Sequence, residues 1–233
     1  MRATVWLVVV SVSLIAHHLS VALVAGAPPD TASVSEAVHE DAAVVIEVPP
    51  NTPAPRPPVK VRLYRSSDVT ADVLRSALNV AEATFAAASV DVVWKVCGPA
   101  ECNVPPTPTV RLVRLVRAPV SGSRDTRCLG DALIDARKGT GVLATVYIDR
   151  VLDLARHLDI NHPTLLGRTI AHEIGHLLLA TSTHSTSGLM RELWSPDELL
   201  ASRADDWVLR PFEAAAIRQR LTMSRADNPN SAL

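Results

Sequence analysis

Residues 169–190 read TIAHEIGHLLLATSTHSTSGLM, a stretch that combines an apolar run with three histidines. His172 and His176 are four residues apart, which corresponds to about 1.1 turns and about 6 Å of rise in an α-helix. Both imidazoles then project from one face of the helix and can bind a single cation. The pattern predicts a metal site on a buried helix over about residues 163–180.

Glu173 follows His172 directly and lies about 100° around the predicted helix from it. A carboxylate at that angle is not needed as a ligand, but it can reach a water molecule on the metal and act as general base. His184, in the polar segment that follows the helix, is the preferred third ligand. Glu192 and Glu198 remain carboxylate alternatives for that third position.

The composition is that of an ordinary folded protein with one core. The chain has 233 residues, 48% of them hydrophobic, and its 23 basic residues balance 24 acidic ones. A net charge of −1 with scattered basic residues provides no broad field that attracts a nucleic acid backbone. We therefore expect no nucleic acid partner and a single functional domain over residues 59–233.

The first 27 residues have the pattern of a secretory signal peptide. A basic start at Arg2 is followed by an apolar run over residues 5–15 and by small residues ending at Ala27. An uncleaved N-terminal anchor is the alternative, because residues 5–27 nearly reach the ~20 residues that span a membrane. The prolines concentrated in residues 28–58 then predict an extended linker.

Three cysteines occur in the chain, Cys97, Cys102 and Cys128. In an oxidising compartment one disulfide is the default, and a bond between Cys97 and Cys102 closes the smallest loop. Three pairings are possible, and the sequence does not choose among them. The thiol left over is expected to be buried.

Apolar periodicity predicts a layered domain. Strands are expected over residues 59–64, 90–96, 109–116 and 142–148, with a further short apolar stretch at 129–134. Helices are expected from Asp68 or Thr70 to about residue 89, over about 163–180, and over 211–221. A strand, a helix, three or four strands and two helices, in that order, indicate an α/β or α+β fold.

Residues 169–190 resemble the zinc-binding segment of the metzincin metallopeptidases, particularly the matrix metalloproteinase type. In that family His-Glu-x-x-His is followed by a glycine, a third histidine, often a serine, and a methionine turn under the metal. The resemblance implies that His172, His176 and His184 bind Zn²⁺. It further implies that Glu173 is the general base and that Met190 is the methionine of the turn.

Upstream residues extend the resemblance. Residues 129–132 and 146–149 look like the family's substrate-facing edge strand and the strand before its active-site helix. The resemblance thus implies a metzincin-like domain with a mixed twisted sheet, an active-site helix and a C-terminal helix. Two departures stand against it: Leu179 occupies the glycine position, and the third histidine follows His176 by eight residues instead of the family's six.

The resulting expectation is a secreted zinc-dependent metalloendopeptidase that acts on polypeptides as a monomer, without a membrane contact beyond the possible anchor. Its hydrolysis would use a zinc-bound water and Glu173 as general base. The altered turn after His176 motivates the alternative, a catalytically inactive zinc-containing binding domain of the cell envelope or the extracellular space.

Several conspicuous residues are expected to lie outside the site. His157 and His162 are interpreted as solvated loop histidines, and Arg191 as a surface cation. Trp194 and Trp207 are expected to pack in the core or in a wall of the cleft. Met190 would be a plain core methionine if no third ligand were present.

Overall fold

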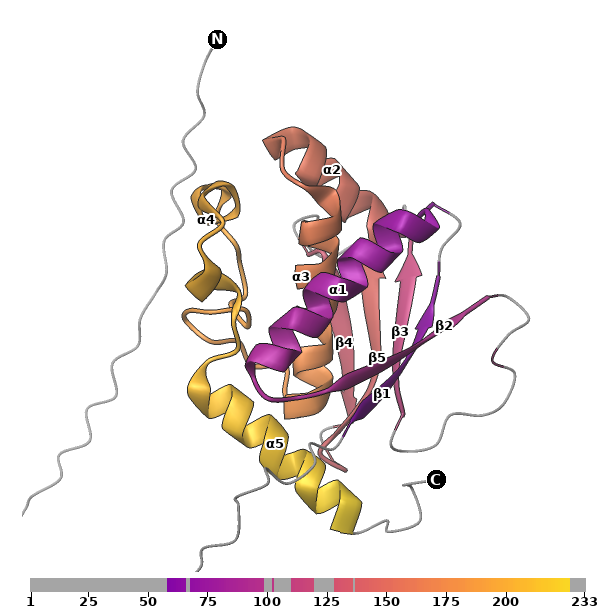
Figure 1. Ribbon diagram of the computed structural model, residues 1–233, viewed down its shortest axis with the longest axis vertical. Coiled ribbons are helices and arrows are strands. Elements are labelled where there is room, and N and C mark those ends of the chain that lie inside the picture. The colour runs from indigo at the N-terminus through magenta and orange to yellow at the C-terminus, as the bar shows by residue number, and fades with distance from the viewer. Residues whose placement is uncertain are drawn as a thin grey trace, which may run out of the picture. The chain divides into compact units, whose positions relative to one another are not determined.

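The structure, a computed structural model, describes residues 58–65, 68–98, 102, 110–119, 128–135 and 137–226 (Figure 1). All of them belong to one compact unit, Thr52–Leu233. The predicted signal peptide at residues 1–27 lies outside the described residues, as does the predicted linker except for its last residue.

A five-stranded mixed sheet forms the centre of the unit, with strand order β2-β1-β3-β5-β4. β1 pairs in parallel with β2 and β3, β3 pairs in parallel with β5, and β4 closes the order antiparallel to β5. β4 is therefore an edge strand. The strands are β1 (Val59–Tyr64), β2 (Val92–Cys97), β3 (Val110–Val116), β4 (Gly130–Asp135) and β5 (Thr140–Tyr147).

Two long helices, α1 (Ala71–Ala87) and α3 (His162–Leu179), contact each other beside the sheet (Figure 1). α1 begins where the Thr70 side chain accepts a hydrogen bond from the backbone N–H of Val73. α3 contacts β4 and β5 as well as α1, so it lies at the centre of the packing. The largest fully buried side chains include Leu63, Phe85, Ile148, Ile170, Ile174 and Ile217.

The start of α3 shows why this segment is helical. The side chain of Asn161 accepts a hydrogen bond from the backbone N–H of Thr164, and Pro163 occupies the first turn, where its missing N–H costs nothing. At Gly167 an added Cβ would collide with the backbone carbonyl oxygen of Ala77 in α1. A glycine at this position therefore lets α1 and α3 approach closely.

The predicted mixed α/β architecture is confirmed, but three further helical segments were not predicted. They are α2 (Ile148–Leu158), α4 (Pro196–Ala201) and the short 3₁₀ segment η1 (Ala204–Trp207), which lie before α5 (Pro211–Ala226). α2 follows β5 without a break, and its N-cap Tyr147 makes no side-chain capping hydrogen bond. The sequence pattern thus lacked the polar residue that normally marks a helix start.

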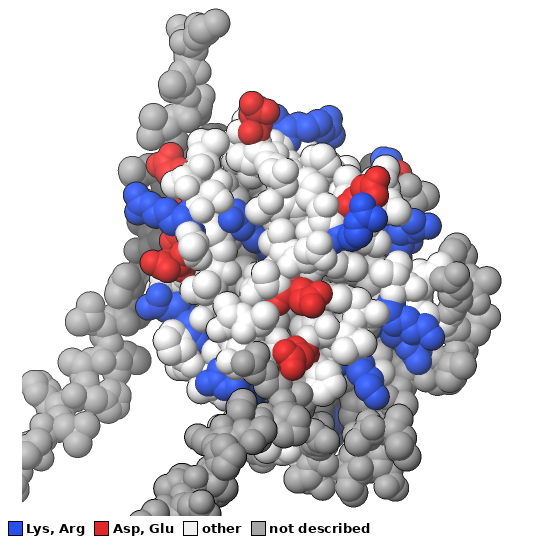
Figure 2. Space-filling view, in the orientation of Figure 1, with Lys and Arg blue, Asp and Glu red and all other residues white. Residues whose placement is uncertain are grey.

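The disulfide joins Cys97 and Cys102, the smallest of the possible loops. Cys128 is a free thiol and is exposed, which contradicts the expectation that the remaining thiol is buried. None of the helices in the described part of the chain is long and apolar enough to cross a membrane. On the face drawn in Figure 2, side chains of both charges are interspersed.

Candidate metal centre

Three imidazoles converge at the C-terminal end of α3. The Nε2 atom of His176 lies 3.0 Å from Nε2 of His172 and 3.2 Å from Nε2 of His184. One ligand atom from each of the three rings lies within 4.8 Å of the other two. His172 and His176 are buried, whereas His184 is exposed. The structure thus brings together all three histidines that the sequence singled out.

Backbone carbonyls orient two of these rings. Nδ1 of His172 lies 2.9 Å from the carbonyl oxygen of Leu189, and Nδ1 of His176 lies 2.8 Å from that of Thr181. A carbonyl only accepts, so each Nδ1 carries the proton and donates it. Each Nε2 is then left with a lone pair directed at the others, an arrangement that is repulsive without a cation between them.

Burial also keeps these rings neutral. Desolvation, followed by the neighbouring His176, lowers the pKa of His172 to about 3. Desolvation also lowers the pKa of His176. Three imidazole nitrogens without a carboxylate are a donor set that suits zinc better than the oxygen-seeking Mg²⁺ or Ca²⁺. The residues present therefore fit a zinc ion.

The chain turns toward the third histidine at Ala180. This residue has φ 51° and ψ 43°, the left-handed conformation that usually requires glycine at the end of a helix. The N–H groups of Ala180 and Thr181 both donate to the carbonyl oxygen of His176. The departure from the expected glycine at position 179 is thus accommodated one residue later, by an alanine.

Two contacts hold the segment around His184. The backbone N–H of Ser185 donates to the carbonyl oxygen of Met190 at 2.9 Å, and the Ser185 hydroxyl donates to the buried carboxylate of Glu213. Glu213 also accepts from the backbone N–H of Arg210 and thereby caps α5. The position next to the third histidine is therefore fixed to the C-terminal helix.

Met190 lies against the middle of the histidine motif. Its side chain is 1% exposed, and an added Cβ at Gly175 would lie 2.5 Å from its sulfur atom. Gly175 lies between the two helical histidines on α3, so Met190 packs directly against the backbone that carries them. A larger residue at position 175 would push this thioether away.

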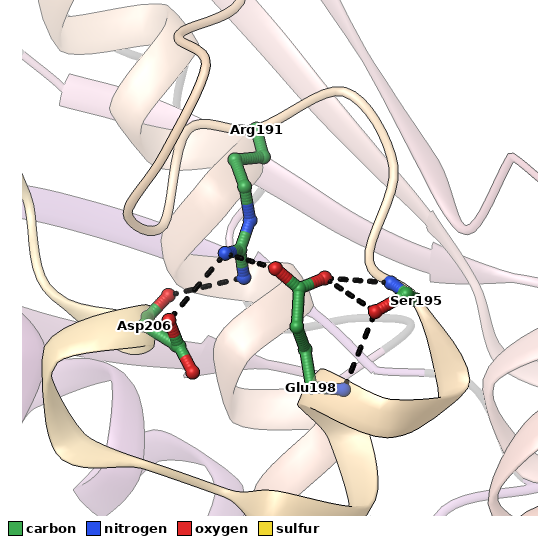
Figure 3. A network of polar contacts seen from close by, with 4 residues as sticks. All are labelled: Arg191, Ser195, Glu198 and Asp206. Carbon is green, nitrogen blue, oxygen red and sulfur yellow. Dashed lines mark hydrogen bonds and ion pairs between the residues drawn. The ribbon is translucent and has the colours of Figure 1, made fainter.

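The residue after Met190 is the centre of a polar network (Figure 3). Arg191 is buried, and its Nη1 lies 2.5 Å from Oε1 of Glu198 and 3.6 Å from Oδ1 of Asp206. Glu198 also accepts hydrogen bonds from the backbone N–H and hydroxyl of Ser195. The expectation of a solvated Arg191 was wrong, because α4 and η1 fold back and supply two carboxylates.

Aromatic rings complete the wall on this side. The ring of Trp194 meets that of His172 edge to face at 5.6 Å between centroids, and Trp194 meets Trp207 in the same way at 5.1 Å. Trp207 is buried. The expectation that both tryptophans pack in the core or the wall is confirmed.

Glu173 lies on the side of α3 that faces β4. Its side chain is 5% exposed, and an added Cβ at Gly130 would lie 2.7 Å from its Oε1 atom. Burial, followed by the nearby negative charge of Asp131, raises the pKa of Glu173 to about 8. Gly130 therefore provides the space that this carboxyl occupies beside the edge strand.

Other sequence candidates lie apart from the three rings. Glu192 is exposed, and Glu198 is bound to Arg191, so neither carboxylate alternative joins the histidine cluster. His157, on α2, and His162, at the start of α3, are exposed. The expectation that these two histidines lie outside the site is in agreement with their positions, although both are helical.

Sequence analysis placed Asp131 and Tyr147 in the two strands beside the site but did not predict that they pair, and it did not identify Glu213. The Tyr147 hydroxyl donates to Oδ2 of Asp131 at 2.5 Å, which raises the pKa of Tyr147 to about 12. Glu213, three residues after Arg210 and two after Pro211, has the spacing of a helix cap, and this signal could have identified it. No local signal pairs Asp131 with Tyr147.

Comparisons with known proteins find similar solved structures, among them the following two. An archaemetzincin from Methanopyrus kandleri is 15% identical with a TM-score of 0.46, and the match covers 75% of this chain and 99% of that one. Metalloproteinase-II from Bacteroides fragilis is 15% identical with a TM-score of 0.45, over 72% of this chain. The present chain spans 55% of that second protein. No protein-family model and no curated protein matches the chain.

Proposed function

We propose that the chain is a zinc-dependent metalloendopeptidase of the metzincin type that hydrolyses polypeptides outside the cytoplasm. The observation that carries the proposal is the convergence of three imidazole nitrogens at the end of α3, with Glu173 on the same helix. His172, His176 and His184 would hold the metal. Met190 would serve as the methionine beneath the site.

A zinc ion bound there supplies Lewis acidity, which polarises a peptide carbonyl and makes water more acidic. Glu173 takes the proton from the attacking water at its carboxylate and returns it to the nitrogen of the leaving amine. The raised pKa of this buried carboxyl falls again when a cation is held nearby, so that the carboxylate form is present at neutral pH. Leu189 and Thr181 keep the histidine rings in the required tautomer.

The substrate would lie extended along β4. The close approach of Gly130 to Glu173 supports this path, because the proposed general base then lies beside the beginning of the edge strand. A peptide that adds by main-chain hydrogen bonds to this edge, which no described strand covers, would carry its backbone past Glu173. The absence of a side chain at Gly130 lets the strand lie close to α3.

Zinc content and peptide hydrolysis of the purified protein test the proposal. We expect one zinc ion per chain, cleavage of casein and its loss on chelation. Glu173→Gln should keep zinc but lower hydrolysis by about 10²- to 10⁴-fold, because it removes proton transfer alone. Glu192→Gln, which changes an exposed glutamate, is the matched control and should leave both properties unchanged.

Two results would contradict the proposal. A protein without zinc when purified from zinc-containing medium would remove the metal site. A zinc-loaded protein without chelator-sensitive cleavage of any peptide would favour the alternative, an inactive zinc-containing binding domain. Export is a separate part of the proposal, and N-terminal sequencing of the mature protein distinguishes a cleaved signal from an anchor at residues 1–27.

A further inference from the structure

β4 presents two different faces. Gly130 faces α3, because an added Cβ there would touch Glu173. Successive residues of a strand point to opposite faces, so Asp131 and Leu133 share the face turned away from α3. Their partners in β5 are Thr145 and Leu143, and the regular register ends between Leu133 and Ile134.

Leu133 is an exposed apolar residue of this edge strand. Its side chain is 59% exposed, although it lies on a strand whose outer edge is unpaired within the described residues. Edge strands normally carry charges or proline at such positions, because an exposed apolar edge invites pairing with other chains. An exposed leucine at this edge is placed to contact an apolar side chain of a strand that adds to it.

Asp131 supplies a charge two residues before Leu133. Its side chain is exposed, and its Oδ2 atom accepts a hydrogen bond from the Tyr147 hydroxyl, which fixes the position of the carboxylate. A carboxylate has about four acceptor positions, so this bond leaves room for a second donor. The nearby cation Arg150 is occupied, since it donates to the carbonyl oxygen of Cys128 and lies 4.7 Å above the Tyr147 ring.

We propose that Asp131 and Leu133 select the substrate by its side chains: an extended peptide with a lysine or arginine opposite Asp131 and an apolar residue opposite Leu133. Residues that are directly opposite in paired strands point to the same face, so the two substrate side chains are separated by one residue. This inference rests on the proposed peptidase function, of which it defines the substrate class.

The size of the preference for lysine or arginine follows from the exposure of Asp131 to water. An ion pair in contact with water is worth about 0.2–1 kcal/mol, which corresponds to a factor of about 1.4–5 in kcat/KM. Such a preference weakens at high ionic strength. Arg150→Gln should increase the preference for lysine, because it removes a cation beside Tyr147, the partner of Asp131.

A lysine scan through an extended fluorogenic decapeptide tests the proposal on the zinc-loaded full chain. We expect one position at which lysine raises kcat/KM about threefold over alanine and glutamate lowers it. Asp131→Asn, which still accepts from Tyr147, should abolish this difference, and Asp131→Lys should reverse it. Leu133→Ser should remove only the preference for leucine two positions away. Asp153→Asn, an exposed aspartate on α2, is the control.

Binding measured without hydrolysis separates this inference from the proposed function. Fluorescence anisotropy of labelled lysine and glutamate peptides on the Glu173→Gln variant reports edge recognition alone. If no peptide is cleaved but lysine binding depends on Asp131, the peptidase proposal fails and the recognition surface stands. If Asp131→Asn leaves the preference unchanged in both measurements, or if glutamate is preferred by the wild type, the inference is overturned.

Discussion

The two ends of α3 both carry histidine, but only one end has the geometry of a metal site. At the N-terminal end His162 is exposed and borders a cavity of about 230 Å³. At the other end three rings meet at nitrogen distances of 3.0 and 3.2 Å. The cavity at the N-terminal end is lined by Asp68, Val69, Thr70, Val73, Ile148, Val151, Leu152, His162 and Leu166.

The difference shows that neither a histidine nor a cavity is enough for a metal site. His162 has no second histidine one turn away, whereas His172 and His176 are aligned by the helix and oriented by carbonyls outside it. Those carbonyls belong to Leu189 and Thr181, in the segment that follows α3. The end of the helix therefore becomes a site because the chain returns to it.

The largest effect on zinc binding is expected when a histidine is removed from the C-terminal end of α3, compared with a histidine removed from its N-terminal end. His176→Ala should reduce zinc from one ion per chain to none, because two imidazoles give an incomplete site. His162→Ala, on the same helix, should leave zinc binding unchanged. Metal analysis after gel filtration measures both. Equal zinc loss in the two variants would show that the metal binds elsewhere or that α3 unfolds.

Two glycines of α3 provide a second comparison. Gly167→Ala collides with the backbone of α1 and should lower the free energy of unfolding by about 2–3 kcal/mol. Gly175→Ala meets the flexible end of Met190 and should cost about 1 kcal/mol, partly offset by the better helix propensity of alanine.

The two substitutions should affect zinc affinity in the opposite order to their effects on stability. Gly175→Ala displaces the thioether next to the histidines and should weaken zinc binding by about tenfold, as a change in the support of metal ligands does. Gly167→Ala should leave affinity unchanged in the folded protein. Urea unfolding and competition with a zinc-sensitive dye measure the two quantities, and equal effects on affinity would contradict a supporting role for Met190.

Elements whose boundaries are set by neighbouring residues were predicted from the sequence, and elements without such local signals were not. The metal-site helix was predicted within one or two residues, because its apolar run, Pro163 and the histidine spacing are all local. α2 was missed because it continues directly from β5 without a capping side chain. Local patterns therefore predicted the elements with ordinary boundaries and failed where one element passes into the next.

The same distinction applies to the site. The histidine positions were predictable, whereas the bond between Ser185 and Glu213 joins residues 28 apart in sequence. The pair of Tyr147 with Asp131 depends on the register between β4 and β5, which composition does not reveal. Arg191 was misjudged for the same reason, since its carboxylate partners come from segments that fold back onto it.

The stability of the metal-free protein should depend on pH through the buried groups His172 and Glu173. The native pKa of His172 is lowered to about 3, so the unfolded chain binds its proton first and stability falls as pH drops from about 6.5. The native pKa of Glu173 is raised to about 8, so the native state keeps a proton that the unfolded chain releases above about 4.5. This contribution to stability is lost as pH rises through 8.

Because the two slopes oppose each other between about 4.5 and 6.5, we expect the stability maximum of the metal-free protein in that interval. Urea unfolding of chelator-treated protein between pH 4 and 9 measures the free energy of unfolding at each pH and so locates this maximum. Glu173→Gln should flatten the alkaline slope. An unchanged alkaline slope in Glu173→Gln would contradict the raised pKa.

The smallest effect concerns the residue that ends α3. Ala180 has a left-handed backbone, which costs an L-residue about 1–2 kcal/mol, and Ala180→Gly removes that cost. Glycine also gains entropy in the unfolded chain, so the net gain in unfolding free energy should be about 0.5 kcal/mol. The contact between His176 and the carbonyl of Thr181 should persist, which leaves zinc affinity unchanged. A clear loss of stability would instead show that the Ala180 methyl group contributes packing that outweighs the backbone strain.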